Sequence, residues 1–330
     1  MARIDLGFQN QNDDNTREAA GQNGTNEEIT VNDNGTSATS NGPSVTSSSM
    51  TLEEVSDPNK ITVTIADDET PIVVLFGPKS CGKTMTLVRL TRYLKANGYT
   101  VEPVKSFRPA HDRNYKDMCD NYDTMVNSED AAESTSKINF MLVRVLNGAK
   151  PLCQILEGPG EYYFDSKSPK ANFPRFVNAI INSKNRKIWA VIVEPDTASV
   201  LNNEDRMNYA QKVSKLKVKM KPRDKVIFLF NKIDETHFVV SPGNINSAQA
   251  VKHIAQTYQG IFSHFRNQNP ITRLWREYLC DFVAFQTGDF CTADDGTLTY
   301  QEGDDSYPRN FWNVILKRIR GVRQWLQSTT

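Results

Sequence analysis

Short apolar runs alternate with longer amphipathic segments along most of this 330-residue chain. The runs are rich in β-branched residues and bounded by polar ones, which predicts buried strands. Such strands are expected at 71–76, 138–146, 151–156, 188–193, 226–230 and 281–286. Apolar residues at helical spacing predict helices at 84–96, 169–182, 199–221, 247–266 and 311–326. Strands that alternate with helices predict a three-layer α/β fold with a mostly parallel sheet.

Turn signals add detail to this pattern. Asn147-Gly148 separates two apolar runs, which is a strong hairpin signal, so the strand at 138–146 is expected to be the one antiparallel strand. In the last helix, Trp312 and Trp325 fall outside the apolar face and are expected at its rim. Weaker patterns predict strands at 60–66 and 99–107, a helix at 115–125, a helical extension at 274–278 and a hairpin within 288–307.

The first 58 residues have a different composition from the rest. They are rich in Asn, Ser, Thr, Gly and Asp and hold few large apolar side chains. Such a segment cannot bury enough surface to offset its ordering entropy. We therefore expect a disordered acidic N-terminal tail over 1–58 that is dispensable for ligand binding. One domain over 59–330 should follow, with insertions at about 99–137 and 288–307.

Charge and cysteine content exclude several classes of protein. The 39 basic and 39 acidic residues cancel, but residues 1–60 hold three basic and ten acidic ones, so that the remainder carries 36 against 29. This excess is mild, and the lysines between 212 and 221 fit a solvated helix face better than a nucleic-acid site. Five scattered cysteines form no Cys-x-x-Cys pair, which favours free thiols in a reducing compartment. With no signal peptide or transmembrane run, a cytoplasmic protein is expected, without nucleic acid or peripheral membrane contact.

The segment Gly77–Thr84 reads G-x-x-x-x-G-K-T between a predicted strand and a predicted helix. The backbone N–H groups of such a loop and the helix N-terminus form a concave site for phosphate. Lys83 should reach the β- and γ-phosphates, and the Thr84 hydroxyl should ligate Mg²⁺. The alternative is a tight turn that binds nothing. The nucleotide-binding residues expected here are Gly77, Lys79, Ser80, Cys81, Gly82, Lys83, Thr84 and Met85.

Three further polar motifs follow predicted strands, and carboxyl ends of parallel strands share one edge of a sheet. Glu157-x-x-Gly160 can hold a metal through water, and the Gly160 N–H can sense a γ-phosphate. Asn231-Lys232-x-Asp234 can read a base, because one carboxylate can accept both N–H donors of the guanine edge, which adenine lacks. In that motif Asn231 can brace the loop and the Lys232 stem can lie over the base. Thr287, after the last strand, is a weaker candidate for base contact, and an ordinary turn is the alternative.

In this order the motifs resemble those of the Ras-like small GTPases, within the translation-factor-related class of P-loop proteins, over about residues 70–326. A looser similarity connects the chain to bacterial members found in double-GTPase and conflict-system proteins. The resemblance implies a switch I threonine as a metal ligand. Thr135, 22 residues before Glu157, fits this place, and Thr124 is the alternative. It also implies the metal set Thr84, Thr135 and Glu157 and the catalytic set Lys83, Thr135 and Glu161.

Two departures from this family concern the reaction. Glu157 replaces the usual Asp, and Glu161 stands where many members carry the Gln that orients water. Arg108 and Arg113 lie in the first insertion and could act on the phosphates in cis, although the favoured interpretation is that they are solvated loop residues. A competing class, with the signal-recognition and metallochaperone-type GTPases, also has a strand after the P-loop helix. The hairpin around Asn147-Gly148 favours the Ras-like class.

The sequence thus predicts a guanine-nucleotide-binding switch that hydrolyses GTP slowly to GDP and phosphate with Mg²⁺. The alternative is a GTP-binding scaffold with little or no turnover. In either case a protein effector or activating protein is the expected partner.

Overall fold

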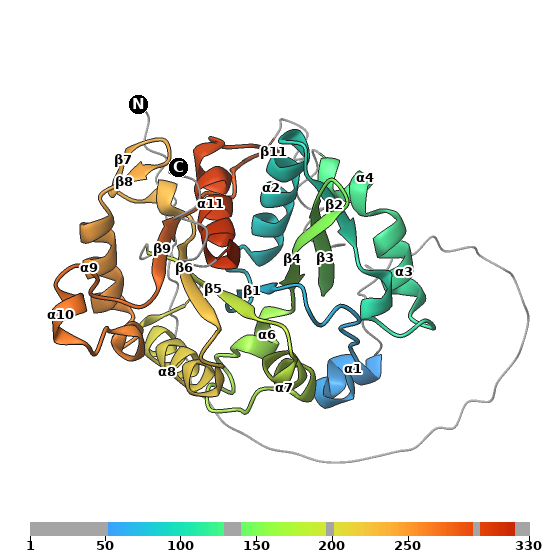
Figure 1. Cartoon of the computed structure of the whole chain (residues 1–330), viewed down its shortest axis with the longest axis horizontal. Helices are drawn as coiled ribbons and strands as arrows, with labels where there is room; N and C mark the ends of the chain where they lie inside the picture. Colours follow the sequence, from blue (N-terminus) through green and yellow to red (C-terminus); the bar gives the residue numbers. More distant parts are fainter. Residues whose placement is uncertain (1–51, 129–139, 196–200, 293–297, 321–330) are drawn as a thin grey trace, which may run out of the picture. The chain divides into compact units, whose positions relative to one another are not determined.

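The computed structural model describes residues 52–128, 140–195, 201–292 and 298–320. A seven-stranded sheet with the order β2-β3-β4-β1-β5-β6-β9 forms the centre of the fold (Figure 1). In that order the strands are Thr100–Pro103, Met141–Asn147, Lys150–Glu157, Ile72–Phe76, Lys187–Val193, Lys225–Phe230 and Asp281–Ala284. Only β3 runs against its neighbours, and every other pair within the sheet is parallel. The predicted mostly parallel sheet with one antiparallel strand is confirmed.

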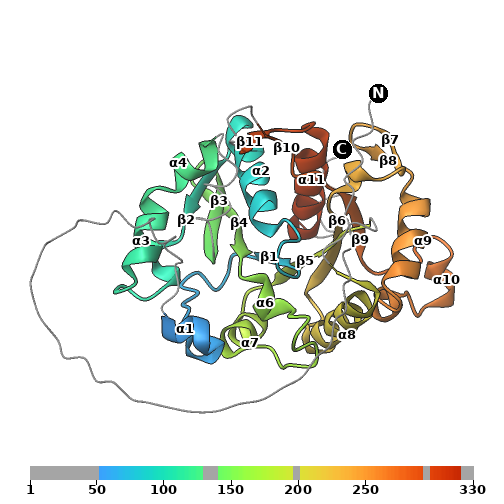
Figure 2. The ribbon, with the colours of Figure 1, turned by 180° about the vertical axis from the view of Figure 1, so that it is seen from behind.

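Helices cover both faces of this sheet, which gives the predicted three layers. Helices α2 (Lys83–Ala96) and α11 (Ser306–Arg320) lie side by side on one face, and α6, α7 and α8 lie on the other (Figures 1 and 2). Every residue of β1 and β5 is buried between the two helical layers. The helices of the second face and its end are α6 Gly160–Tyr163, α7 Arg175–Asn182, α8 Asn203–Lys219, α9 Ser247–Thr257 and α10 Pro270–Arg273.

The first insertion adds a strand and two short helices beside the sheet. Strand β2 pairs antiparallel with β3 and so becomes the edge of the sheet, and α3 (Arg113–Asp120) and α4 (Tyr122–Asn127) follow. The prediction of a strand at 60–66 is wrong. That segment is extended but is not paired as a strand. Its Thr64 N–H donates a single backbone hydrogen bond to the Phe107 carbonyl, at 2.8 Å.

The second insertion is a hairpin, as predicted. Strand β10 (Asp289–Thr292) pairs antiparallel with β11 (Leu298–Gln301). A further small pair, β7 (Val239–Ser241) with β8 (Asn244–Ile245), was not predicted, because Ser241-Pro242-Gly243 interrupts a run too short to show alternation.

Several helix boundaries differ from the predicted ones. Helix α7 begins only after Pro174, and α9 ends at Thr257 ahead of Gly260, which has a positive φ of 84°. The predicted extension at 274–278 is wrong, because this segment turns back to a bridge between Arg266 and Tyr278. In α11, Trp312 is buried against Tyr99 rather than placed at the rim.

The folded body begins earlier than the predicted boundary at residue 58. Residues Leu52–Ser56 form helix α1, and Glu54 is buried in an ion pair with Arg108. A second short turn, Pro58–Lys60, continues from it. The boundary therefore moves to Leu52, and residues 1–51 lie outside the described chain. Among the described residues, no helix combines the length and apolar character needed to cross a bilayer.

Candidate functional site

Six of the seven strands run in the same direction and end at the same edge of the sheet, and the predicted motifs follow four of them. The register aligns Leu75 with Glu157 and Phe76 with Val191, so the P-loop and the Glu157 turn start side by side. The loop after Phe230 lies next along the edge, beside the loop that follows Ala284. The structure thus gathers motifs that are separated by up to about 200 residues in the sequence.

The P-loop has a backbone that only certain residues allow. Gly82 has a φ of 86°, and a Cβ there would collide with the side-chain nitrogen of Asn231. A Cβ at Gly77 would lie 2.5 Å from the Cys81 sulfur. Ser80 also takes a positive φ, of 63°. Both glycines of the motif are therefore required by close approach, and Gly82 by its backbone conformation as well.

Inside the loop, Lys83 is nearly buried and its ammonium donates a hydrogen bond to the Pro78 carbonyl at 2.8 Å. This bond holds the cationic head within the loop that it closes. Lys79 and Ser80 are exposed at the tip of the loop, whereas Cys81 and Met85 are buried beneath it. Burial raises the pKa of the Cys81 thiol to about 11, so it stays neutral and serves as packing.

Thr84 and Glu157 form the strongest candidate for a metal site. Glu157 Oε1 accepts a hydrogen bond from the Thr84 hydroxyl at 3.2 Å, and Oε2 accepts one from the Phe140 N–H at 3.0 Å. Glu157 is only 2 % exposed, and this burial raises the pKa of its carboxyl, against the opposing effects of Lys83, Phe140 and Thr84. A buried carboxylate beside a hydroxyl is the oxygen donor set that Mg²⁺ prefers, so the residues fit this ion.

Gly160 lies against the P-loop. A Cβ on Gly160 would lie 2.5 Å from the Lys83 ammonium nitrogen and closer still to the backbone of Pro78 and Lys79. Its φ is not positive, so the absence of a side chain is required here by space alone. Glu161 follows in the first turn of α6 with its side chain exposed.

The third motif is tied directly to the P-loop. Asn231 is fully buried, and its side-chain amide donates to the Cys81 carbonyl at 2.9 Å. Lys232 takes a left-handed backbone conformation and pairs with Glu194 at 2.7 Å. Partial burial acts to lower the pKa of Lys232, but the hydrogen bond and charge of Glu194 outweigh it and raise the pKa. Asn231 therefore connects the loop after β6 to the P-loop.

Sequence reasoning missed Glu194. It is 3 % exposed directly after β5, and it positions the Lys232 side chain whose stem was expected over the base. The available signal was a carboxylate directly after the apolar run at 188–193.

The last two base candidates lie together. Asp234 is exposed to solvent, although neighbouring atoms desolvate part of its carboxyl and raise its pKa. The donor side chain of Gln286 beside this carboxyl acts on the pKa in the opposite direction, and the Gln286 amide donates to Asp289 at 3.5 Å. Thr287 is buried, and its methyl carbon lies 3.5 Å from the position of a Cβ on Gly82. The loop after β9 thus lies beside the P-loop.

The structure does not place a switch I threonine. Thr135 lies outside the described residues. The alternative, Thr124, is exposed on α4, and its neighbour Asp123 pairs with Lys95 in the last turn of α2. Lys95 is 11 residues from Thr84 along that helix, which is roughly 16 Å. Thr124 is therefore remote from the candidate metal ligands Thr84 and Glu157.

Arg108 does not act on the phosphates, because its guanidinium is bound elsewhere. Its guanidinium is 2 % exposed and holds both Glu54 oxygens, at 2.7 and 2.6 Å, together with Asp112 at 2.9 Å. Its remaining Nη1 donates to the Thr62 carbonyl. Arg113 is exposed at the start of α3.

Comparison with known proteins gives structural similarity only. No family model matches the chain, and no curated protein matches it. A crystal structure of nucleolar GTP-binding protein 1 from Plasmodium falciparum is 12% identical with a TM-score of 0.39, over 81% of this chain and 96% of the other. The SRb-GTP/SRX complex from Chaetomium thermophilum is 10% identical with a TM-score of 0.38, over 75% and 98%. The GDP- and phosphate-bound Ski7 GTPase-like domain from S. cerevisiae is 11% identical with a TM-score of 0.37, over 77% and 51%. Similarity at this level does not assign the chain to a family.

Proposed function

We propose that this protein is a guanine-nucleotide-binding switch that hydrolyses GTP slowly in the presence of Mg²⁺. The observation that carries the proposal is the convergence of three sites at one sheet edge. The buried Lys83 in its loop, the Thr84–Glu157 oxygen pair and the braced Asn231–Asp234 loop meet there. Phosphate, metal and base each have a complementary group at this edge.

The phosphates would lie in the P-loop, against its backbone N–H groups and the N-terminus of α2, with Lys83 neutralising their charge. Mg²⁺ would be held by Thr84 directly and by Glu157 through water, and when bound it would neutralise the charge that develops on the β- and γ-oxygens. The Gly160 N–H is close enough to the loop to sense a γ-phosphate.

The sheet order supports the Ras-like class over its competitor. Strand β4, which ends in Glu157, lies parallel to β1, and the antiparallel β3 flanks it. Four buried free cysteines among the described residues fit a reducing cytoplasm. A protein effector or activating protein is the partner we expect for such a switch.

A low-turnover GTP-binding scaffold remains the second candidate, because one observation favours it. Arg108 is committed to Glu54 and Asp112, so it supplies no charge to the phosphates. Single-turnover hydrolysis of GTP with and without Mg²⁺ separates the two functions. Mg²⁺-dependent release of phosphate supports the switch, whereas tight binding without release supports the scaffold.

The test of the guanine assignment is Asp234→Asn. A carboxylate accepts both N–H donors of guanine, whereas an amide complements xanthine, which has a carbonyl in place of the exocyclic amine. We expect wild type to prefer GTP over ATP at least about a hundredfold, because adenine leaves a desolvated carboxylate unpaired. In competition binding, the variant should lose affinity for GTP and gain affinity for xanthosine triphosphate. A preference of wild type for ATP, or an unchanged GTP preference in the variant, would contradict the proposal.

A further inference from the structure

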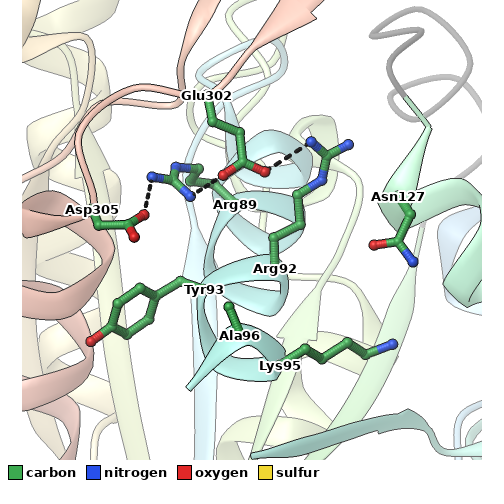
Figure 3. Close-up of a pocket in the computed structure, with 8 residues that line it drawn as sticks. All are labelled: Arg89, Arg92, Tyr93, Lys95, Ala96, Asn127, Glu302 and Asp305. Atoms are coloured by element: carbon green, nitrogen blue, oxygen red, sulfur yellow. Dashed lines mark hydrogen bonds and ion pairs between the residues drawn. The ribbon is translucent and has the colours of Figure 1, made fainter. Parts of the chain in front are cut away.

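The hairpin insertion after β9 is fastened to the P-loop helix by two arginines (Figure 3). Arg89 of α2 is 1 % exposed and donates to Glu302 at 2.5 Å, to Asp305 at 2.6 Å and to the Gly303 carbonyl at 2.7 Å. Arg92, one turn along, donates to the other oxygen of Glu302 at 2.9 Å. The carboxylate of Glu302 thus bridges both arginines. A buried guanidinium paired in this way fixes the base of the hairpin on α2.

From this anchor, one contact leads to the backbone of the loop after β9 that holds Thr287, which we call the base loop. The guanidinium of Arg92 lies over the Tyr300 ring, 5.0 Å from its centroid. Tyr300 is 6 % exposed, and its hydroxyl donates to the Thr287 carbonyl. Burial raises the pKa of Tyr300 to about 12, so the hydroxyl keeps its proton at neutral pH.

A second contact leads to the carboxylate of the base motif. Gly303, whose carbonyl accepts from Arg89, packs so closely on Gln286 that a Cβ would collide with the Gln286 amide. The Gln286 side chain adjoins the Asp234 carboxyl and acts as a donor that lowers its pKa, and the Gln286 amide also donates to Asp289 at 3.5 Å. Gly288, between these contacts, takes a φ of 115° against the Tyr300 ring. Both contacts therefore end on residues assigned to the base, and neither ends on a phosphate residue.

We propose that the β10–β11 insertion, anchored on α2 by Arg89 and Arg92, positions Thr287 and Asp234 for recognition of the purine. Tyr300 and Gln286 are positioning residues in this arrangement, acting through Thr287 and Asp234. The inference rests on the proposed guanine-nucleotide binding and assigns base selectivity to an element outside the four motifs. If the hairpin only stabilised the fold, its loss would lower the affinity for every ligand by the same factor.

The test compares ligands that share phosphates and differ in the base. Affinities for GDP, IDP and inorganic pyrophosphate are measured for wild type, Tyr300→Phe and Gln286→Ala. IDP lacks the exocyclic 2-amino group, so the IDP-to-GDP ratio of dissociation constants reports the contact with Asp234. Tyr93→Phe is the matched control, because Tyr93 lies on α2 beside Arg92 but in none of the contacts to the base loop (Figure 3). Thermal unfolding of each variant is recorded in parallel.

For Tyr300→Phe we expect GDP affinity to fall about fivefold to tenfold, which corresponds to the loss of one buried hydrogen bond, with pyrophosphate affinity unchanged. For Gln286→Ala we expect the IDP-to-GDP ratio to fall severalfold toward one. The control should match wild type in every measurement. Equal losses for all three ligands, or ratios that stay at the wild-type value, would overturn the inference. Failure of wild type to bind GDP would instead overturn the proposed function.

Discussion

Gly160 shows how a single residue can couple two loops through space alone. No side chain fits between its Cα and the Pro78–Lys79 backbone, and the Lys83 ammonium adjoins the same point. Backbone atoms cannot move aside as the end of a flexible side chain can. A Cβ at this position must therefore push the turn after β4 away from the P-loop.

We expect Gly160→Ala to weaken the binding of GTP more than the binding of GDP. The turn would withdraw its N–H from the γ-phosphate, while the P-loop and Lys83 still hold the phosphates that both nucleotides share. The loss of one hydrogen bond to a charged group corresponds to a decrease of about tenfold or more in the GTP-to-GDP affinity ratio. Equilibrium titration with both nucleotides measures this ratio, and equal losses for the two would contradict the expectation.

The sequence was informative at the residue scale wherever a motif requires a particular backbone. Gly77, Gly82 and Gly160 were predicted as site residues, and the structure gives a steric reason for each. The sequence offered a signal for Glu194 itself but not for its role, because that role depends on Lys232, which is 38 positions away in the sequence and adjacent only in the folded chain. The Arg108 role was wrong for the same reason, since its partner Glu54 lay in the presumed tail.

At the element scale, apolar runs predicted the strands well because their burial is set by composition. Helix ends were predicted less well, since Pro174 and Gly260 act through backbone conformations that periodicity does not report. The 60–66 segment has strand-like alternation, but the sheet edge that it could have joined is taken by β2. Alternation alone does not specify a hydrogen-bonding partner.

Strand β5 begins with a buried lysine, and this gives a prediction about pH. Burial lowers the pKa of Lys187 to about 8, against the charge of Asp224, although its ammonium donates to the Ser183 and Asn185 carbonyls. Between that value and the ordinary 10.5, the unfolded chain binds more protons than the folded one. The contribution of Lys187 to stability must therefore rise as the pH increases through this interval.

We expect the unfolding free energy of wild type, relative to Lys187→Met, to rise by about 1–2 kcal/mol between about pH 8 and about pH 9.5. Buried cysteines such as Cys153 have raised pKa values and titrate in the opposite sense, but they are common to both proteins and cancel in the difference. Urea denaturation at several pH values measures the difference. Lys184→Met, at a side chain 84% exposed in the loop just before β5, is the control and should show no such rise. A flat difference for Lys187→Met would show that the amine is protonated throughout.

At the scale of the whole molecule, a series of contacts leads from helix α1, at the start of the folded body, to the candidate metal ligand Glu157. Glu54 of α1 neutralises Arg108, whose guanidinium lies 5.5 Å from the centroid of the Phe140 ring. The Phe140 N–H in turn holds Glu157. The chain before the P-loop strand is therefore part of the support for the site, a relation that its composition did not indicate.

The last prediction follows from this connection and concerns truncation. A chain starting at Met50 keeps α1, and we expect it to match the full-length protein in stability. A chain starting at Asp57 loses Glu54 and leaves the buried Arg108 with Asp112 as its remaining carboxylate partner. Removing one partner of a buried pair costs about 3 kcal/mol, and Mg²⁺-dependent GTP binding should weaken with it because Phe140 loses its support.

Within the longer chain, Glu54→Gln isolates the charge from the rest of α1 and should reproduce most of that loss of unfolding free energy. The adjacent Glu53→Gln is the matched control. Glu53 pairs with Lys60 at 3.3 Å, but its side chain is 78% exposed, so its removal should change stability by less than about 1 kcal/mol. Denaturation of the full-length protein, the two shortened chains and the two variants gives the comparison. Equal stability of the Met50 and Asp57 chains would show that the folded body begins after α1, and that Arg108 is sufficiently paired by Asp112 alone.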